Sequence, residues 1–315
     1  MVHMQAQPIM RFRQFCDRDD AYGANKGDTL LFDKVLNVDT EGGPLDENLP
    51  FPKTGFKTNQ GQAIATEYGN SIPFTEKLER MSKLDAANLH IRAITNDVGK
   101  ALNRAPSLEF RKARIKATPT GTDADPRVTF EATATSTVAC TATATRQAQV
   151  EDILVIAEAL KSGIYTSTSN GATVATGSPV PPYDNDGNYM CVCSVGFASA
   201  IRRDSDFINA SLYGDPERLF AGEIGRFHGI RFIEDNHILR STMDGFRGEA
   251  VFFGAEAVKE IVCLMEEIRK GVPLDGGRDR SWYWYAIIGF KLIWEYAVAE
   301  PDNRIIHFTS SGITS

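Results

Sequence analysis

The longest regular pattern in the chain is a run of apolar residues spaced three and four positions apart between residues 76 and 105. This spacing places them on one face of an α-helix, which predicts a long amphipathic helix. Thr75 is a suitable N-cap residue, and Pro106 is expected to end the helix. Such a helix would be about 45 Å long, enough to brace the whole molecule. The apolar positions are Leu84, Ala87, Ile91, Ile94, Val98, Ala101 and Ala105.

Alternating apolar and polar residues predict strands in four other segments. Residues 128–145 alternate almost throughout, with small or apolar residues on one phase and mostly threonine on the other, which indicates a strand or a hairpin. Residues 189–194 and 304–308 have the length and composition of short strands. Residues 230–234 fit a strand with one buried face, and the glycines before it permit tight turns. These glycines are Gly222, Gly225 and Gly229.

Helical spacing recurs in three shorter segments. Residues 147–162 predict a helix that ends at Gly163, a residue common just after helix C-termini. Residues 195–209 include a short helix, and residues 254–269 predict another, ended by glycine and proline. The aromatic segment 282–299 is interrupted by charged residues, so we expect a buried strand pair or helix there.

A stretch rich in glycine and proline, residues 41–61, separates two segments with strand character at 35–38 and 63–68. This predicts a long hairpin loop. Loops of this length are uncommon in compact domains unless they act on a partner or are disordered. The apolar residues Leu49, Phe51 and Phe56 favour a partner surface. The first forty residues are predicted to form a peripheral arm.

The composition is that of an ordinary folded protein. Of 315 residues, 42% are hydrophobic and 24% are charged, so a sizeable core is possible. The net charge of -7 argues against a generic nucleic-acid binder, which needs a dense Lys/Arg surface. The five cysteines are scattered and odd in number, which fits a reducing compartment. We expect no signal peptide and no membrane span, so the chain is expected to be cytosolic when made.

One cluster of residues could in principle serve acid–base chemistry. Glu223, His228 and Glu234 lie close together in sequence, with Arg231 between them. Alternation along a strand puts Arg231 and Glu234 on opposite faces, so solvated charges around a turn are the better interpretation.

Two other groups also favour a structural reading. Cys191 and Cys193 share a strand face, but no second ligand pair stands at metal-binding spacing, so buried structural cysteines are expected. The tryptophans at 282, 284 and 294 could form a stacking platform, yet few basic residues lie near them, which favours a core or a contact between copies. We find no pattern for a catalytic centre, a cofactor or a metal ion, which is weak evidence for a structural protein.

Two segments carry a resemblance to a known family. The first runs from Ala63 to Thr75 (AIATEYGNSIPFT), at the end of the hairpin and the entry to the long helix. The second runs from Gly222 to Asp235 (GEIGRFHGIRFIED). With the arm, the broken hairpin and the long helix in this order, the chain resembles major capsid (coat) proteins of tailed bacteriophages with the Hong Kong 97-type fold. Within them it looks most similar to the N4-like phage coat proteins.

The resemblance implies an α+β fold of several named parts. These are an N-terminal arm (1–36), an extended E-loop (37–72), a peripheral domain (73–148) with a spine helix (76–105), an axial domain (149–280) and a return to the peripheral domain (281–315).

The resemblance also implies a function. Copies of the chain would assemble into pentamers and hexamers of an icosahedral head shell that encloses double-stranded DNA without reading its sequence, in the virion after assembly in the host cytoplasm. The chain would be no enzyme. Its negative charge would let DNA slide past it. The expected contacts between subunits are Leu49, Phe51, Lys53, Phe56, Lys57, Tyr68, Arg226 and Arg231.

Several partners and one modification follow from the same resemblance. The sequence begins without a long charged helical pro-segment, so a separate scaffolding protein is expected, together with a portal and a possible decoration protein. Some relatives crosslink an E-loop lysine to an asparagine of a neighbour; Lys53 and Lys57 are available, but no partner signature is seen. Two alternatives remain open, an encapsulin-like nanocompartment shell and an α+β enzyme that uses Glu223, His228 and Glu234.

Overall fold

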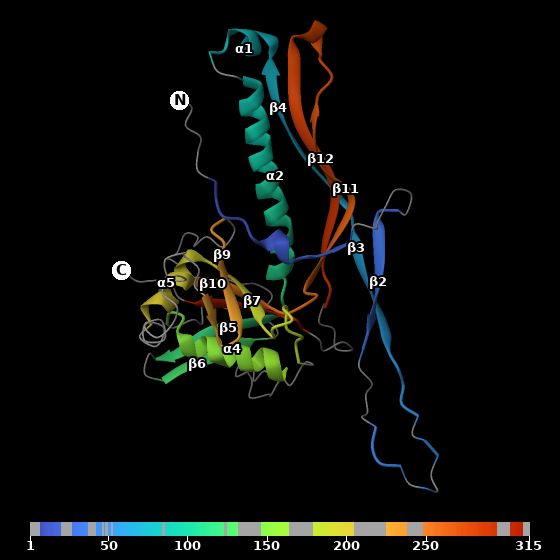
Figure 1. The fold of residues 1–315 in the computed structure, drawn as a ribbon, viewed down its shortest axis with the longest axis vertical. Coiled ribbons are helices and arrows are strands. Elements are labelled where there is room, and N and C mark those ends of the chain that lie inside the picture. Colours follow the sequence, from blue (N-terminus) through green and yellow to red (C-terminus); the bar gives the residue numbers. More distant parts are fainter. Residues whose placement is uncertain are drawn as a thin grey trace.

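The protein is elongated, with one long helix beside long strands, a compact part below them and a projecting hairpin (Figure 1). In the part of the chain that the structure describes, no helix combines the length and apolarity needed to cross a bilayer. This computed structural model describes residues 7–19, 27–36, 42–45, 47, 50–51, 53–83, 86–122, 125–131, 146–163, 179–204, 225–237, 248–294 and 303–310.

The predicted long helix begins after Thr75, as expected, but it consists of two separate helices. Thr75 caps α1 (Glu76–Met81), because the Leu78 amide donates to the Thr75 hydroxyl at 3.3 Å. The chain leaves the helix at Ser82 and resumes as α2 (Ala86–Arg111). The prediction of one helix over 76–105 is therefore wrong at both its continuity and its end.

Pro106 lies inside α2 instead of stopping it. Proline removes one helical hydrogen bond, at a cost of about 3 kcal/mol. The last turn is nevertheless kept, because it carries Phe110 into a fully buried position against Phe12 and Phe253. Burial of a large aromatic side chain offsets much of that cost.

A four-stranded sheet runs alongside α2 (Figure 1). Its helix-facing core contains Ile94 and Leu102 of α2 with Trp284 and Ile288 of the sheet. The sheet order is β1 (Asp17–Asp19), β11 (Val258–Lys270), β12 (Asp279–Leu292) and β4 (Thr66–Thr75).

The helix predicted over 254–269 is wrong, because this segment forms β11. Val258, Ile261 and Val262 fit a helical spacing, but they are β-branched and are buried where β11 pairs with β12. The segment 282–299 begins as a strand, β12, which decides between the two alternatives for its first part. A turn with the short 3-10 helix η2 (Asp275–Gly277) joins the two strands.

The compact part is built on a seven-stranded sheet whose two faces are both covered. Helices α4 (Val150–Ser162) and α5 (Val195–Arg203) contribute to the larger core on one face. The 3-10 helix η1 (Phe12–Phe15) and the end of α2 cover the other. The strand order is β6 (Asp125–Glu131), β5 (Ile115–Thr122), β13 (Ile305–Ser310), β10 (Gly248–Phe253), β7 (Tyr189–Cys193), β9 (Ile230–Glu234) and β8 (Gly225–Phe227).

Most of the other predicted elements are confirmed. The strands at 189–194, 230–234 and 304–308 correspond to β7, β9 and β13. Helix α4 ends at Gly163, whose φ of 69° is left-handed, as predicted for the residue after a helix. The alternating segment 128–145 is a strand as far as Glu131; its remainder up to residue 145, and residues 222–224, lie outside the described residues.

The remaining two strands form the hairpin that projects beyond the compact part (Figure 1). Strand β2 (Thr29–Val35) pairs antiparallel with β3 (Thr58–Ile64). Strand β4 follows β3 after Ala65. The first hairpin strand thus lies within residues 1–36, which the sequence analysis placed in the arm.

Candidate functional site

The hairpin exposes large apolar side chains to solvent. Phe51 is 75% exposed and Phe56 is 65% exposed, and Lys53 and Lys57 beside them are also exposed. Leu49, the other predicted contact in this loop, lies outside the described residues. An exposed phenylalanine gains nothing on a monomer, so these side chains are suited to burial against another molecule.

The two faces of the β2–β3 ribbon differ. On one face Phe32 lies across the strand pair from Gly61, and a Cβ atom at Gly61 would collide with the Phe32 ring. The other face presents Leu31, Val35 and Ile64 to solvent. This exposed face also carries Asp33, Gln60 and Gln62, so it is a mixed surface with three exposed apolar side chains.

The other predicted contact residues lie elsewhere. Tyr68 of β4 packs against the core between α2 and the four-stranded sheet. Arg231 of β9 forms an ion pair with Asp184 at 2.9 Å, and its cross-strand partner Arg226 is exposed. The structure thus does not gather Tyr68, Arg226 and Arg231 with the hairpin residues into one surface.

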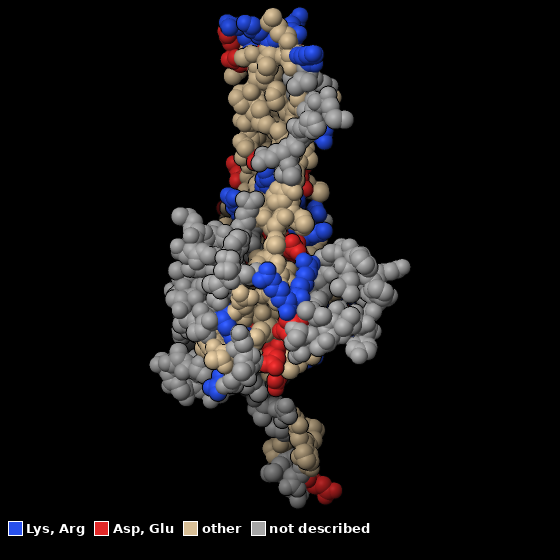
Figure 2. Space-filling view, turned by 90° about the vertical axis from the view of Figure 1, so that its left-hand side faces the viewer, with Lys and Arg blue, Asp and Glu red and all other residues tan. Residues whose placement is uncertain are grey.

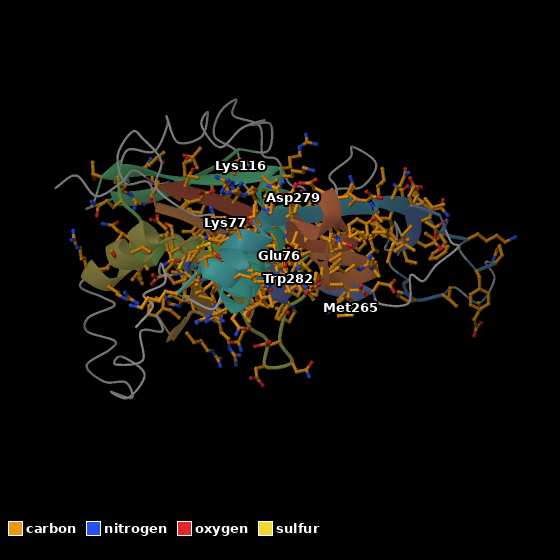
Figure 3. The ribbon with its side chains drawn as sticks, turned by 90° about the horizontal axis from the view of Figure 1, so that it is seen from above. Glu76, Lys77, Lys116, Met265, Asp279 and Trp282 are labelled. Atoms are coloured by element: carbon orange, nitrogen blue, oxygen red, sulfur yellow. The ribbon has the colours of Figure 1, made fainter. Side chains whose placement is uncertain are left out.

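A second exposed apolar group occurs at the far end of the molecule, where α1 meets the β11–β12 turn. Val272 is 82% exposed and Met81 is 74% exposed, and Leu78 and Leu274 are exposed nearby in sequence. Figure 3, viewed onto this end, shows Glu76 of α1 close to Asp279 at the start of β12. Arg280 holds the two elements together through Glu79 at 2.6 Å. Figure 2 shows Lys and Arg side chains gathered over the same end.

Sequence reasoning missed this end because it predicted a helix where β11 runs. The available signal was the segment from Gly271 to Gly277, which contains Pro273 and three glycines between two β-branched or aromatic runs. Such a segment is typical of a hairpin turn.

The predicted arm is anchored to the body from residue 9 to residue 19. The Phe12 amide donates to Asn103 Oδ1 at 2.9 Å, and the Arg11 amide donates to Asp235 Oδ2 at 3.0 Å. Asn103 also donates to Asp235, at 3.1 Å. These two buried side chains therefore join the arm, α2 and the end of β9.

Charge and packing fix the same segment further along. The Arg13 guanidinium contacts Glu260 at 2.9 Å and Glu266 at 2.8 Å. Phe12 is fully buried, and Phe15 packs edge-on against Phe253 at 5.3 Å between ring centroids. The part of the arm that the structure describes before β2 is thus a structural component of the body.

A buried charge network lies on the seven-stranded sheet. His307 Nε2 donates to Glu249 Oε1 at 2.7 Å, and His307 Nδ1 accepts from Lys116 Nζ at 3.0 Å. The Arg111 guanidinium also donates to Glu249, at 2.8 Å. This arrangement requires a neutral imidazole, because a protonated ring has no acceptor nitrogen.

The surroundings of this network lower the pKa values of both His307 and Glu249. Burial lowers the pKa of His307; Glu249 raises it, and Lys116 and Arg111 lower it, with a net decrease. Burial raises the pKa of Glu249, but the hydrogen bond from His307, with the charge and the hydrogen bond of Arg111, brings that pKa below its ordinary value. Both groups are therefore held in the forms they have at neutral pH.

The residues of the enzyme alternative do not converge. His228 is exposed in the β8–β9 turn with a φ of 50°, and burial and the charge of Lys161 lower its pKa. Glu234 stands at the other end of β9, a strand about 13 Å long, and lies 4.0 Å from Arg202. Glu223 lies outside the described residues.

The cysteines and tryptophans have structural positions. Cys191 and Cys193 are fully buried in the larger core, as predicted. Trp284 is buried between α2 and the sheet, and its Nε1 donates to Asp97 at 2.9 Å. Within the described ranges, no group of three or more His, Cys, Asp and Glu side chains is placed to hold a metal ion.

Comparison with known proteins gives results at two levels. No protein-family model matches the sequence, and no curated protein matches it. Solved structures match over nearly the whole chain. The capsid of cyanophage Pam1 matches with a TM-score of 0.70 and 13% identity, over 100% of this chain and 95% of that chain.

Two further matches agree with this result. The acidic stable capsid structure of Helicobacter pylori bacteriophage KHP30 gives a TM-score of 0.69 at 12% identity, over 99% of this chain and 94% of that one. The capsid of Ralstonia phage GP4 gives 0.67 at 14% identity, over 100% and 93%.

The chain therefore has the α+β, Hong Kong 97-like fold of phage capsid proteins. The fold class predicted from the sequence is confirmed. The more specific likeness to N4-like coat proteins stays a prediction.

Proposed function

We propose that this protein is the major capsid protein of a tailed bacteriophage, the structural subunit of its head shell. The observation that carries this proposal is the match to phage capsid structures across 98% or more of the chain, at TM-scores up to 0.70. A match of this extent includes the projecting hairpin and the long helix, whose extended shapes expose more surface than a compact monomer needs.

Copies of the chain would form pentamers and hexamers, and the hairpin would serve as the E-loop that lies over a neighbour. Its exposed Phe51 and Phe56 support this role, since many copies in a closed shell would bury them together. Lys53, Lys57, Tyr68, Arg226 and Arg231, with Leu49, remain proposed contact residues. The division into arm, E-loop, peripheral domain and axial domain remains a proposal on the same grounds.

The proposal extends to the partners of the shell. A scaffolding protein would guide assembly, a portal would occupy one vertex, and a decoration protein is a further possible partner. The shell would enclose double-stranded DNA, assemble in the host cytoplasm and end in the virion. The chain would have no catalytic role, no cofactor and no metal ion.

Electron microscopy of the purified protein, expressed with its genomic neighbours and sized in parallel by sedimentation, tests this function. We expect closed shells, or rings of five and six copies. A homogeneous monomer or dimer under all conditions would overturn the proposal. Packaged DNA would identify a virus, whereas an enzyme cargo would identify the encapsulin-like alternative.

Variants of the hairpin test the proposed contact surface. Phe51→Ser with Phe56→Ser removes the exposed apolar side chains and should prevent closed shells while the monomer keeps its stability. The matched control is Phe51→Leu with Phe56→Leu, which keeps apolar side chains and should still assemble. Equal assembly by both pairs would show that these residues do not make the contact. The variant His228→Ala separates the enzyme alternative from the shell protein. An enzyme that uses His228 should lose its activity with its fold intact, whereas a shell protein should still assemble.

A further inference from the structure

The far end of the molecule, where α1 meets the β11–β12 turn, exposes four large apolar side chains. In the turn, Val272 is 82% exposed and Leu274 is 67% exposed. In α1, Met81 is 74% exposed and Leu78 is 48% exposed, and these two residues lie three positions apart on one helix face. None of the α1 side chains is buried. Exposed apolar side chains that gather in one place mark an interaction site.

Backbone pairing holds the two elements of this end in one arrangement. Leu274 forms a bridge with Asp279, and Asp279 pairs in turn with Thr75, the cap of α1. These three residues therefore lie in one row, about 5 Å from one to the next. The Glu76 amide also donates to the Arg278 carbonyl oxygen at 2.9 Å. A partner that binds here would meet a preformed backbone, and binding would not have to order it.

The described charges of this end are predominantly basic. Residues 76–83 and 270–280 contain six basic and four acidic side chains, whereas the whole chain has a net charge of -7. Figure 2 shows Lys and Arg side chains gathered over the end. Three of the four carboxylates already form ion pairs inside it. The pairs are Glu76 with Arg80 at 2.8 Å, Glu79 with Arg280 at 2.6 Å and Asp275 with Arg278 at 3.3 Å.

Two lysines of this end are not neutralised in this way. Lys77 and Lys83 are exposed, and neither forms an ion pair with any residue that the structure describes. A cation beside exposed apolar side chains attracts a carboxylate and disfavours a second cationic surface. The far end is therefore suited to a surface that combines apolar side chains with carboxylates.

We propose that the far end is the docking surface for an acidic amphipathic segment of another protein. The apolar side chains of that segment would cover Val272, Leu274 and Met81, and its carboxylates would pair with Lys77 and Lys83. A nucleic acid would supply negative charge but would leave the apolar side chains uncovered. A second copy docked through the same end would bring like charges together. The proposal does not depend on the proposed capsid function.

Two synthetic peptides of equal length test this surface. Both form amphipathic helices with leucine on one face, and the polar positions are glutamate in one peptide and lysine in the other. Each peptide carries a fluorescent label and is titrated with the full-length protein, at a concentration where sedimentation shows the protein to be unassembled. Fluorescence anisotropy should show saturable binding of the glutamate peptide, weakened by added salt. The lysine peptide should bind at least about tenfold more weakly.

Two variants of the far end separate the apolar contribution from the electrostatic one. Val272→Ser with Leu274→Ser removes the exposed apolar side chains of the turn and should weaken binding of the glutamate peptide at least about tenfold. Lys77→Glu with Lys83→Glu reverses the charge and should also weaken binding of the glutamate peptide, while strengthening that of the lysine peptide. All four positions are exposed, so the thermal unfolding midpoint should stay within a few degrees of the original.

The matched control is Leu31→Ser with Val35→Ser, which removes exposed apolar side chains from the hairpin and should bind both peptides like the original protein. Absence of saturable binding by the glutamate peptide would overturn the proposal. Equal binding of the two peptides, or an equal loss in the hairpin control, would overturn it as well. Sedimentation without peptide examines a second copy as the occupant. Dimers that disappear in Val272→Ser with Leu274→Ser would show that another copy covers this end, against the proposal.

Discussion

The arm and the hairpin are neighbouring segments near the N-terminus, and both look peripheral in the sequence. In the structure they are opposites. Residues 9–19 are held by buried partners, with Phe12 fully buried, whereas the hairpin leaves Phe51 and Phe56 in solvent. Apolar residues in an extended segment therefore do not by themselves show whether that segment belongs to the core of its own chain or is open to another molecule.

What separates the two segments is backbone hydrogen bonding to buried side chains. The amides of Arg11 and Phe12 donate to Asp235 and Asn103, which are buried residues of the body. Strands β2 and β3 satisfy much of their backbone by pairing with each other. The hairpin can thus project without leaving its paired groups unsatisfied, while the arm needs the body.

The largest expected contrast is between one phenylalanine of each segment. Phe12→Ala should destabilise the protein by about 3–5 kcal/mol, because it leaves a cavity in a packed core. Phe51→Ala should change stability by no more than about 0.5 kcal/mol, because the side chain is exposed. Denaturant unfolding of the unassembled protein measures both. Similar losses for the two variants would contradict the contrast.

A smaller effect is expected at the buried amide that anchors the arm. Asn103→Ala leaves the Phe12 amide without its acceptor and should cost about 1–3 kcal/mol. Hydrogen exchange should accelerate at residues 9–13 and stay unchanged in the hairpin. The control Asn70→Ala removes an exposed hydrogen bond to Asp97 and should cost less. Unchanged exchange in the arm would show that Asn103 does not anchor it.

Acid should weaken the body that holds the arm. The pKa of folded His307 lies below its ordinary value of 6.5, so the folded state binds this proton less readily than the unfolded state. Stability should therefore fall as the pH drops below about 6.5. Glu249, whose folded pKa lies below 4.5, adds a further loss as the pH falls through that folded value.

The pH dependence of urea unfolding midpoints measures this effect. His307→Gln should reduce the slope between about pH 7 and pH 5, whatever its effect on stability at neutral pH. The exposed His228→Gln should retain most of the slope. A His307→Gln variant with the original slope would rule out the buried network as its source.

The smallest effect on overall stability is expected within the hairpin. At Gly61 a larger side chain would collide with the Phe32 ring, so Gly61→Val should displace that ring at a local cost of about 1–3 kcal/mol. Exchange should accelerate in β2 and β3, with little change in the global unfolding midpoint. Gly55→Val, where no atom lies within 4 Å of the added Cβ, is the control. A large global loss would show that the hairpin is integral to the body.

Local signals predicted local features well. Thr75 caps a helix, Gly163 ends one, and β7, β9 and β13 lie where short apolar runs stand between breakers. Each of these depends on residues a few positions apart, which the sequence displays directly. The resemblance to capsid proteins likewise rested on the order of elements, which the fold retains.

Features that depend on distant partners could not be predicted in this way. The position of Phe12 is set by a hydrogen bond to Asn103, 91 positions away in the sequence. The position of Arg13 is set by Glu260, 247 positions away. The period of the apolar residues around Val258 fits a helix or a strand, and only pairing with β12 decides between them. The exposed end at Val272 was not predicted for the same reason, because a helix was expected where β11 runs.

The order of the four-stranded sheet has a consequence for the growing polypeptide on the ribosome. Strands β1 and β4 come from the first 75 residues, but their partners in this sheet, β11 and β12, extend over residues 258–292. Until those residues leave the exit tunnel, β1 and β4 lack these partners and α2 lacks much of its apolar support. This half of the molecule can therefore complete its packing only after the late strands have been synthesised. Copies that are still being translated lack this packed half and are poorly prepared to associate with other copies too early.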